Sequence, residues 1–384
     1  MKIAVTTLAF CVAALLALGM VMLYSAGLTE ARTPTQVQAG PHYLLLQMTW
    51  CVLGLVLCAT ATMLDYRLLK KIVWPLFGVA MVLLVLVLLP LPHGFTKKIN
   101  GTHRWFILPG MRLQPSEFAK LALLIVLAWY GEHFQRQMGG WKRGILIPGL
   151  CIGLVCGLIF KEPDVGNALL IGAVSGIVLL LAGIRMKYFL PPLIAALLAV
   201  GIFIYHDPMR SGRIYSWLHL EETKLAKGHQ AYQAMVALGS GGITGKGLGN
   251  GRQKLGWVPE HHTDFIFSII GEELGLVATL VVVVAFVVIV LCGVYISLRA
   301  PDPFGVLLGC GLTLLIGLQA FINIGVVTSA LPNKGLPLPF ISYGGSNLLA
   351  MFACVGLLFS IARRGRETQR VTNPFAADEL PQPA

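Results

Sequence analysis

The chain has 384 residues, of which 56% are hydrophobic and only 12% are charged, and its formal net charge is +12 at pH 7. A mean hydropathy of +0.78 excludes a soluble domain, because too few polar residues remain to cover its surface. The basic residues divide between the two sides of a membrane, so the net charge identifies no partner, and we expect no nucleic acid. The composition predicts an all-α, polytopic integral membrane protein.

Crossing about 30 Å of hydrocarbon takes roughly 20 apolar residues in a helix. Stretches of about this length predict ten transmembrane helices, over residues 3–24, 43–63, 72–91, 117–130, 144–160, 165–184, 187–205, 274–298, 304–330 and 347–362. The first could instead be a signal peptide, but its apolar run exceeds the roughly 7–15 residues of a signal core, which favours an uncleaved span. We expect one membrane domain over residues 1–366 and a disordered cytoplasmic tail over 367–384.

Lysine and arginine beside the spans predict the orientation, with both termini in the cytoplasm. The short inner loops then contain Arg67, Lys70, Lys71, Arg136, Lys142, Arg143, Arg185, Lys187 and Arg299. The outer side holds two long loops, residues 92–116 and 206–263, the second between helices 7 and 8. Because the inner loops are so short, we expect the function at the outer face of the cytoplasmic membrane.

All eight cysteines fall within predicted spans, and none lies in an outer loop where oxidation would pair it. They lack metal-ligand spacing, so we interpret them as apolar packing residues and predict no protein metal site. No nucleotide-binding glycine motif stands in a soluble strand–helix context, which argues against an ATP-driven pump.

The first outer loop leads into a helix with ionisable groups at its start. Arg104 and Arg112 lie in the loop, and Glu117 and Lys120 share one face of the first helical turn. A surface ion pair would explain them. However, Lys120 precedes an apolar run, and ionisable groups at this depth usually face a cavity or a partner, so we favour a functional role.

A short link between two predicted spans carries two carboxylates, Glu162 and Asp164. Pro163 and Gly166 supply the tight turn that so short a link requires. The carboxylates could bind a cation or position a sugar hydroxyl, and they could equally cap the following helix, which Asp164 suits. The sequence does not decide between these interpretations.

The second outer loop holds the strongest group of polar residues. Residues 245–254 alternate glycines with basic residues that include Lys254, and such a backbone can approach an anion closely, although it matches no nucleotide-binding pattern. Asp264 stands just before an aromatic helix start, with Glu260 and two histidines within one turn. A carboxylate at an apolar edge suits a general base; a helix cap is the alternative. The histidines lack spaced partners for a metal.

The helix after Asp264 is too long for one straight span. Residues 265–298 would make a helix about 51 Å long, against about 30 Å of hydrocarbon. Its first turns must therefore project, tilt strongly or line a wet cavity. If residues 274–298 cross the membrane, Glu272 and Glu273 lie near the outer interface and Asp264 lies roughly two turns above them.

A third outer segment, residues 331–346, contains Lys334, Ser342 and Tyr343. Three prolines and three glycines forbid a regular helix there. Irregular backbone at membrane depth persists only where it is buried in protein or faces water. Lys334 could reach an anionic head group; a plain connecting loop is the alternative.

In this order and spacing, the motifs resemble the SEDS family (FtsW, RodA and SpoVE) over nearly the whole chain. The resemblance rests on Gly101…Arg104-Trp105, Gln114-Pro115-Ser116-Glu117…Lys120, Glu162-Pro163-Asp164…Gly166, Gly247-Leu248-Gly249…Lys254, Pro259-Glu260…Thr263-Asp264-Phe265-Ile266-Phe267, Gly271-Glu272-Glu273 and Gly335-Leu336-Pro337-Leu338-Pro339-Phe340-Ile341-Ser342-Tyr343-Gly344-Gly345-Ser346. The Lys334-Gly335-Leu336 stretch is more similar to the FtsW branch than to RodA. Asn167 departs from the usual Thr, and Asn347 from a second Ser.

The resemblance implies ten transmembrane helices and a peptidoglycan glycosyltransferase that polymerises lipid II at the outer face of the cytoplasmic membrane during cell division. It implies Asp264 as the catalytic loop aspartate. Residues expected to bind substrate are Arg104, Arg112, Glu117, Lys120, Lys254, Glu260 and Lys334, and those expected to support the site are Glu162, Asp164, Glu272, Glu273, Ser342 and Tyr343. No cofactor is expected, although a divalent cation could help to stabilise the leaving group. Implied partners are lipid II, undecaprenyl-pyrophosphate-linked glycan, a class B penicillin-binding transpeptidase and other division proteins.

Other functions compete with this one. In a lipid II flippase, the outer cavity would serve for passage, and Arg112, Glu117 and Lys120 would escort a head group across the membrane. In a non-catalytic scaffold, the loops would only bind the transpeptidase and other division proteins. A RodA-like role in elongation is a further alternative.

Overall fold

The structure is a computed structural model, and it describes residues 1–27, 39–89, 104–108, 111–226, 228–255 and 263–372. Its helices are α1 (Lys2–Gly27), α2 (Ala39–Met63), α3 (Leu69–Leu88), α4 (Pro115–His133), α5 (Ile147–Lys161), α6 (Val165–Leu181), α7 (Met186–His206), α8 (Pro208–Leu218), α9 (His229–Gly241), α10 (Ile266–Leu298), α11 (Pro303–Val327) and α12 (Gly345–Thr372). A π-helical stretch, Lys142–Leu146, runs directly into α5, and short 3-10 turns occupy Tyr66–Leu68 and Gln135–Gln137. The predicted all-α, polytopic fold is confirmed.

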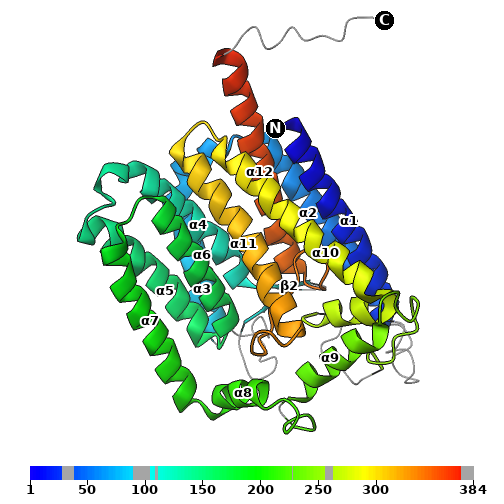
Figure 1. Cartoon of the computed structure of the whole chain (residues 1–384). Coiled ribbons are helices and arrows are strands. Elements are labelled where there is room, and N and C mark those ends of the chain that lie inside the picture. The colour runs from blue at the N-terminus through cyan, green and yellow to red at the C-terminus, as the bar shows by residue number, and fades with distance from the viewer. Residues whose placement is uncertain (28–38, 90–103, 109–110, 227, 256–262, 373–384) are drawn as a thin grey trace, which may run out of the picture.

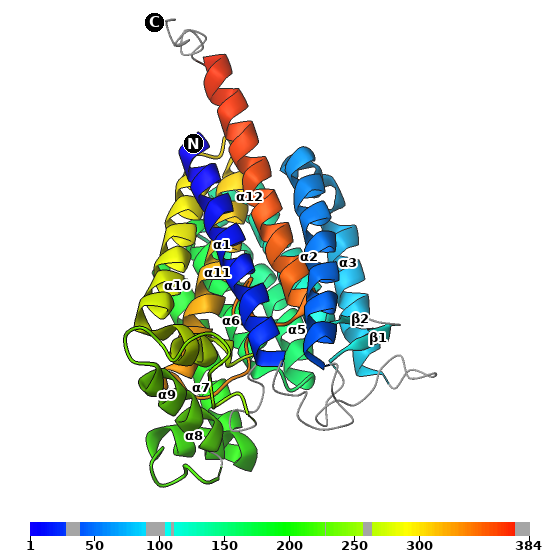
Figure 2. The same cartoon turned by 90° about the vertical axis from the view of Figure 1, so that its right-hand side faces the viewer.

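A short antiparallel hairpin accompanies the helices. Its strands are β1 (Phe106–Leu108) and β2 (Met111–Leu113), with Ile107 opposite Arg112. The hairpin comes directly before α4 in the chain, and it lies in the lower part of the molecule in Figure 2. It therefore delivers the chain from the first outer loop into α4.

Each of the ten predicted spans corresponds to a helix. Among the described residues, eight helical segments are long and apolar enough to cross a membrane, and they correspond to α1, α2, α3, α5, α7, α10, α11 and α12. The remaining two predicted spans form α6, an apolar helix of 17 residues, and α4, a helix of 19 residues that contains Glu117 and Lys120. Figure 1 shows the start of α1 and the end of α12 at one end of the bundle, and α8 and α9 at the opposite end.

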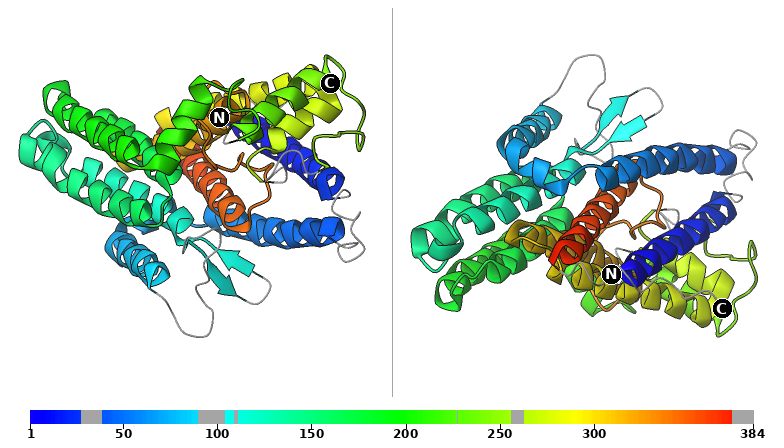
Figure 3. Two further views of the ribbon diagram at one scale, coloured as in Figure 1. Left: turned by 90° about the horizontal axis from the view of Figure 1, so that it is seen from below. Right: turned by 90° about the horizontal axis from the view of Figure 1, so that it is seen from above.

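The core of the bundle forms around α11 and α12. Most residues of these two helices are buried, whereas α7 has no buried residue and lies at the edge of the molecule (Figure 3). Close packing of α11 against α10 depends on small residues: a Cβ atom at Gly293 would overlap the side chain of Thr313. The second outer loop contains two helices, α8 and α9, that the sequence did not predict.

The predicted excess length of α10 is resolved by a break at Gly275. This residue has φ 79° and ψ −172°, a conformation that glycine adopts readily and other residues rarely do. The turns before the break are buried and pack beside α9, and residues 276–298 form the part that is long enough to cross the membrane. At the other end of the chain, α12 continues to Thr372, past the predicted domain boundary at residue 366.

Candidate active site

Asp264 lies two residues before α10, and in Figure 2 the start of α10 is at the end of the bundle away from the start of α1. It is half-buried, and its backbone carbonyl accepts a hydrogen bond of 2.8 Å from Asn323 Nδ2. A Cβ atom at Gly335 would overlap carboxylate oxygen Oδ2 of Asp264, so the lack of a side chain at Gly335 lets the third outer segment lie against this carboxylate. The N-cap position of α10 is Phe265, so Asp264 is not the N-cap residue.

Two side-chain amides of α11 hold the irregular segment beside Asp264. Asn323 Nδ2 donates to the carbonyl of Leu336 at 2.6 Å, and Gln319 Nε2 donates to the carbonyl of Pro337 at 2.9 Å. Because Asn323 also binds the carbonyl of Asp264, one amide fixes both sides of the contact between Asp264 and Gly335. Gln319 and Asn323 lie four positions apart and therefore on one face of α11.

Ser342 also holds the same irregular segment in place. Its Oγ accepts from the backbone N–H of Leu338 at 2.8 Å and donates to the carbonyl of Thr263 at 2.6 Å, next to Asp264. The buried residues of this stretch include Leu336, Leu338, Phe340 and Ile341. Tyr343 is half-buried and packs against the core. The prediction that irregular backbone would be buried in protein or face water agrees with this arrangement, because residues 338–342 are buried and Gly335 is exposed.

Behind this segment lies a buried group that we call the Lys120 cluster: Glu117, Lys120, Asn167, Gln319 and Asn347. Lys120 Nζ lies 2.7 Å from Glu117 Oε1, 3.2 Å from Asn167 Oδ1 and 3.4 Å from Gln319 Oε1. Asn347 Nδ2 donates to the second oxygen of Glu117 at 3.0 Å. The side chains of Lys120 and Glu117 are 1% and 3% exposed, so this ammonium is enclosed by the chain's own acceptors and is not open to a ligand here.

The carboxylate of Asp164 links Asn167 of the Lys120 cluster to Gln114, which precedes α4. This carboxylate accepts from the backbone N–H and side-chain amide of Asn167, at 3.2 and 2.8 Å, and thereby caps α6. The same carboxylate accepts from Gln114 Nε2 at 3.3 Å. Ser346 Oγ accepts from the backbone N–H of Gln114 and donates to the carbonyl of Arg112, each at 3.0 Å. The start of α12 therefore holds β2, and the side chain of Arg112 is exposed.

The turn between α5 and α6 contains a buried carboxylate with an unusual environment. Arg104 donates from Nε to the carbonyl of Glu162 at 2.6 Å and from Nη2 to the carbonyl of Pro163 at 2.7 Å. The side chain of Glu162 is fully buried, and neither carboxylate oxygen has a hydrogen-bond partner among the described residues. Burial, reinforced by the charge of Asp164 and opposed by Arg104, raises the pKa of Glu162 to about 8.

The glycine-rich stretch folds onto the break in α10 and forms a second ionic group, buried except for Lys246, which we call the Glu273 cluster: Ser25, Lys246, Lys254, Glu272 and Glu273. Lys254 Nζ lies 2.6 Å from Glu273 Oε1, and Ser25 Oγ of α1 lies 2.8 Å from the same ammonium. Glu272 pairs with Lys246 at 2.8 Å. Both glutamates are fully buried, and Lys254 is 3% exposed.

Backbone N–H groups complete the Glu273 cluster. Those of Arg252 and Gln253 donate to Glu272 at 2.9 and 3.1 Å, and that of Gly249 donates to Glu273 at 3.0 Å. A Cβ atom at Gly245 would overlap the backbone of Glu273. The glycine-rich backbone does approach anions closely, as its composition predicted, and in this structure the anions are two carboxylates of the same chain.

The cations predicted to bind substrate therefore differ in accessibility. Lys120 and Lys254 are buried and bonded within the protein, Arg104 is bonded to the α5–α6 turn, Arg112 is exposed and Lys334 is half-buried. Glu260 and the adjacent histidines lie outside the described residues. Within the described ranges, no group of three or more His, Cys, Asp or Glu side chains has the geometry of a metal site. The expected absence of a cofactor, with a divalent cation as an option, stays a prediction.

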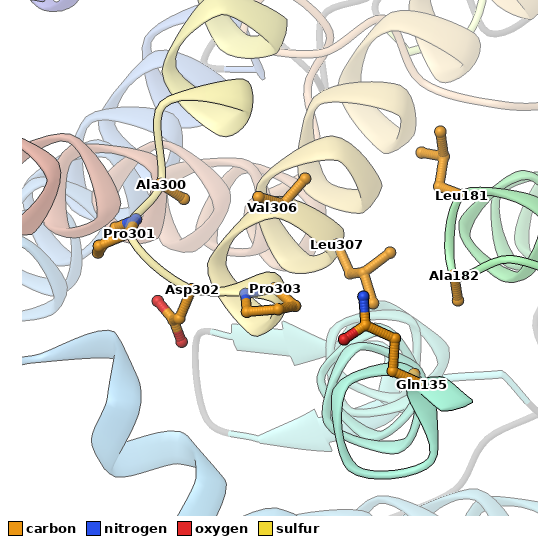
Figure 4. Close-up of a pocket in the computed structure, with 10 residues that line it drawn as sticks. Gln135, Leu181, Ala182, Ala300, Pro301, Asp302, Pro303, Val306 and Leu307 are labelled. Carbon is orange, nitrogen blue, oxygen red and sulfur yellow. The ribbon is translucent and has the colours of Figure 1, made fainter. Parts of the chain in front are cut away.

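A cavity of about 350 Å³ lies at the opposite end of the bundle. Figure 4 shows Asp302 and Gln135 among its lining residues, which come from the end of α4 and the turn after it, the end of α6, the link between α10 and α11, and the start of α11. Asp302 is bonded to Lys70 and to the hydroxyl of Tyr66. This cavity is remote from Asp264 and forms no part of the candidate active site.

A family model described as "Cell cycle protein", FtsW/RodA/SpoVE, matches residues 6–367 of the chain. The chain belongs to this family.

Similar proteins agree with the family match over most of the chain. The chain is 38% identical over 355 residues to a probable peptidoglycan glycosyltransferase FtsW of Geobacter metallireducens, covering 92% of this chain and 93% of that one. It is 39% identical over 351 residues to the protein of the same name from Trichlorobacter lovleyi, with 91% of each chain covered.

Solved structures share the fold. A chain from a structure described as "Structural coordination of polymerization and crosslinking by a peptidoglycan synthase complex" superposes with a TM-score of 0.76 at 29% identity, covering 93% of this chain and 97% of that one. The rod shape determining protein RodA of Thermus thermophilus superposes with a TM-score of 0.67 at 29% identity, covering 93% and 95%.

Sequence reasoning missed several residues of the candidate site and of its two clusters. Gln319 and Asn323 were available as a signal, because polar side chains within an apolar span usually face the protein interior. Asn167 and Asn347, noted only as departures from the family pattern, both belong to the Lys120 cluster, where their amides bind Lys120 and Glu117. Ser25 carried no local signal, because its partner Glu273 is 248 positions away.

Proposed function

We propose that this protein is an FtsW-type peptidoglycan glycosyltransferase that polymerises lipid II into glycan strands during cell division. The observation that carries the proposal is the half-buried carboxylate of Asp264, which lies against Gly335 in an irregular segment that Gln319, Asn323 and Ser342 hold in place. The family match and the names of the relatives support the activity, and the FtsW names among the relatives support the role in division.

Asp264 acts as the general base. Its carboxylate accepts the proton of the acceptor's 4-hydroxyl while that oxygen attacks the anomeric carbon of the donor glycan. As the new carbon–oxygen bond forms, the bond from the anomeric carbon to the diphosphate oxygen breaks, and its electron pair leaves on undecaprenyl diphosphate. This single displacement inverts the anomeric centre and leaves no covalent enzyme intermediate.

Lys120 acts as a positioning residue. Its ammonium holds Gln319 Oε1, and the amide nitrogen of Gln319 holds the carbonyl of Pro337 in the segment beside Asp264. Glu117 in turn neutralises the buried charge of Lys120. The Lys120 cluster thus holds the segment that lies against Asp264. Exposed cations such as Arg112 contact the substrate.

We infer that the Asp264 end of the bundle faces away from the cytoplasm. The support is the group of basic residues at the end that holds the termini, including Arg136, Arg185 and Arg299, as the positive-inside rule predicts. A class B penicillin-binding transpeptidase is the proposed partner. Its support is that the similar solved chain comes from a synthase complex in which polymerization is coordinated with crosslinking.

The Asp264→Asn variant tests this function, because asparagine keeps the shape of the side chain and removes its basicity. We expect purified protein with this substitution to form no glycan polymer from lipid II on a gel, and to keep its melting temperature. The exposed substitution Glu221→Gln is the matched control and should polymerise normally. Full activity of Asp264→Asn would reject the general base, and transport of labelled lipid II across vesicles without polymer formation would favour the flippase.

A further inference from the structure

The short helix α8 carries cations that the proposed reaction has not yet used. It lies across one end of the bundle, between the lower end of α7 and α9 (Figure 1). Its C-terminal part is fixed to the α11–α12 connection, because Trp217 Nε1 donates to the carbonyl of Ser329 at 2.8 Å. The same connection continues through Lys334 to Gly335, which touches the carboxylate of Asp264. Arg210 and Arg213 of α8 are therefore joined to the immediate surroundings of Asp264.

Arg210 is held in a fixed orientation. Its guanidinium lies over the ring of Phe203 at 4.3 Å and near that of Phe160 at 5.7 Å, and its Nη1 is 3.3 Å from Asp207. That nitrogen is buried against Asp207, whereas 18% of the side chain is exposed. A stacked guanidinium that keeps part of its surface exposed can present its remaining donors to a phosphate.

Positive charge gathers around Lys334. Burial lowers the pKa of this half-buried lysine, and the charges of Arg210 and Arg213 lower it further, while Asp164 acts in the opposite direction. Three cations are thus within electrostatic reach of one another, and the described carboxylates near them include Asp164, which caps α6, Asp207, which pairs with Arg210, and Asp264, which lies against Gly335. These cations attract an anionic ligand.

We propose that Arg210 and Arg213, together with Lys334, form the subsite for the diphosphate of the lipid-linked donor. The inference rests on the proposed function, in which undecaprenyl diphosphate leaves from the anomeric carbon next to Asp264. It places the donor on the α8 side of Asp264. The buried Lys120 and Lys254 ammoniums have no role in this subsite, because the chain's own oxygens already surround them.

The test measures binding of undecaprenyl diphosphate to the full-length protein in phosphatidylcholine nanodiscs. Arg210→Gln/Arg213→Gln should weaken this binding by about tenfold or more, because each lost charge-assisted phosphate contact is strong. The single change Arg210→Lys, which keeps the charge but not the two-pronged geometry, should weaken it less. The matched control Arg136→Gln removes an exposed arginine at the opposite end and should bind as the parent does.

Two further comparisons distinguish a diphosphate subsite from a site for ordinary phospholipid. Undecaprenyl monophosphate should bind more weakly than the diphosphate, and phosphatidylglycerol in the nanodiscs should not displace the diphosphate. Unchanged diphosphate affinity in the double variant, with an unchanged KM for lipid II, would overturn the subsite. So would complete competition by phosphatidylglycerol, which would assign the arginines to ordinary phospholipid. Melting temperatures check folding, and Arg213→Gln alone leaves the stacking of Arg210 intact.

The two proposals fail in different ways. If the parent protein makes no polymer but binds undecaprenyl diphosphate through Arg210 and Arg213, the subsite stands and the glycosyltransferase function fails. If the parent makes polymer and the double variant matches it in KM and in diphosphate affinity, the function stands and the subsite fails.

Discussion

Two buried ionic clusters lie at the same end of this membrane bundle, and they are completed in different ways. In the Glu273 cluster, the glutamates receive backbone N–H groups of a glycine-rich loop, and Ser25 brings α1 into the same network. In the Lys120 cluster, side-chain amides from α6, α11 and α12 surround one ion pair. The first fastens a loop to a broken helix, whereas the second reaches the segment beside Asp264 through Gln319. We infer that the first is structural and the second serves the site.

The largest effect on stability should come from breaking the pair at the centre of the Glu273 cluster. Lys254→Met leaves a fully buried carboxylate without its counter-ion, which typically costs about 3–5 kcal/mol of folding free energy. Lys246→Met is the matched control, because Lys246 is 33% exposed and its partner Glu272 keeps two backbone donors. Thermal unfolding in detergent should show a much larger loss for Lys254→Met, and equal losses would contradict the structural role of this cluster.

Paired substitutions sharpen the distinction between the two clusters. Both Lys254→Met/Glu273→Gln and Lys120→Met/Glu117→Gln should recover roughly 2 kcal/mol relative to the single lysine variants, because no buried charge is left unpaired. Polymerisation should recover in the first double variant only. In the second, Gln319 has lost the ammonium that orients its amide, so the segment beside Asp264 is held less firmly.

The measurements for this pair are a melting curve and a lipid II polymerisation rate for each variant. At a temperature at which both proteins are folded, we expect the Lys120→Met/Glu117→Gln protein to polymerise lipid II about tenfold or more slowly than the parent. Normal polymerisation by this variant would remove the Lys120 cluster from the function, and loss of polymerisation in both double variants would erase the proposed difference.

The sequence predicted the helices well and their ends less well. Apolar runs located all ten spans, because crossing hydrocarbon demands a nearly constant length of apolar helix. The sequence showed that the helix after Asp264 is too long for one span, but it did not show where the helix breaks. The break depends on Gly275 fitting against the backbone of Ile243 and Gly245, which the fold brings beside it. The helices α8 and α9 lie in a polar loop, where hydropathy carries no signal for a span.

The candidate site was predictable in its residue types but not in its pairing. The motif order pointed to Glu117, Lys120, Lys254 and Glu273, which are all present as buried ions. Their separation into two clusters depends on contacts between distant segments, such as that of Ser25 with Glu273, and no local pattern encodes these. For that reason the glycine-rich stretch suggested a ligand anion, whereas the structure fills it with Glu272 and Glu273.

Glu162, a buried carboxylate outside both clusters, tests whether pairing is what allows charge to be buried in either cluster. Its pKa is raised from 4.5 to about 8, so the folded state favours the protonated form more than the unfolded state does. The stability that this proton provides is fully present below pH 4.5 and is lost as the pH rises toward 8, at about 1 kcal/mol per pH unit. Glu162→Gln should flatten that decline between pH 6 and 8, as measured by melting temperature.

The contrast with a paired carboxylate gives this experiment its control. Glu273→Gln removes a carboxylate of equal burial whose charge Lys254 neutralises, so it should destabilise the protein and should not flatten the decline. Parallel pH profiles for the parent and Glu162→Gln would mean that Glu162 finds a counter-charge in the folded protein. In that case it would belong with the two clusters rather than stand apart from them.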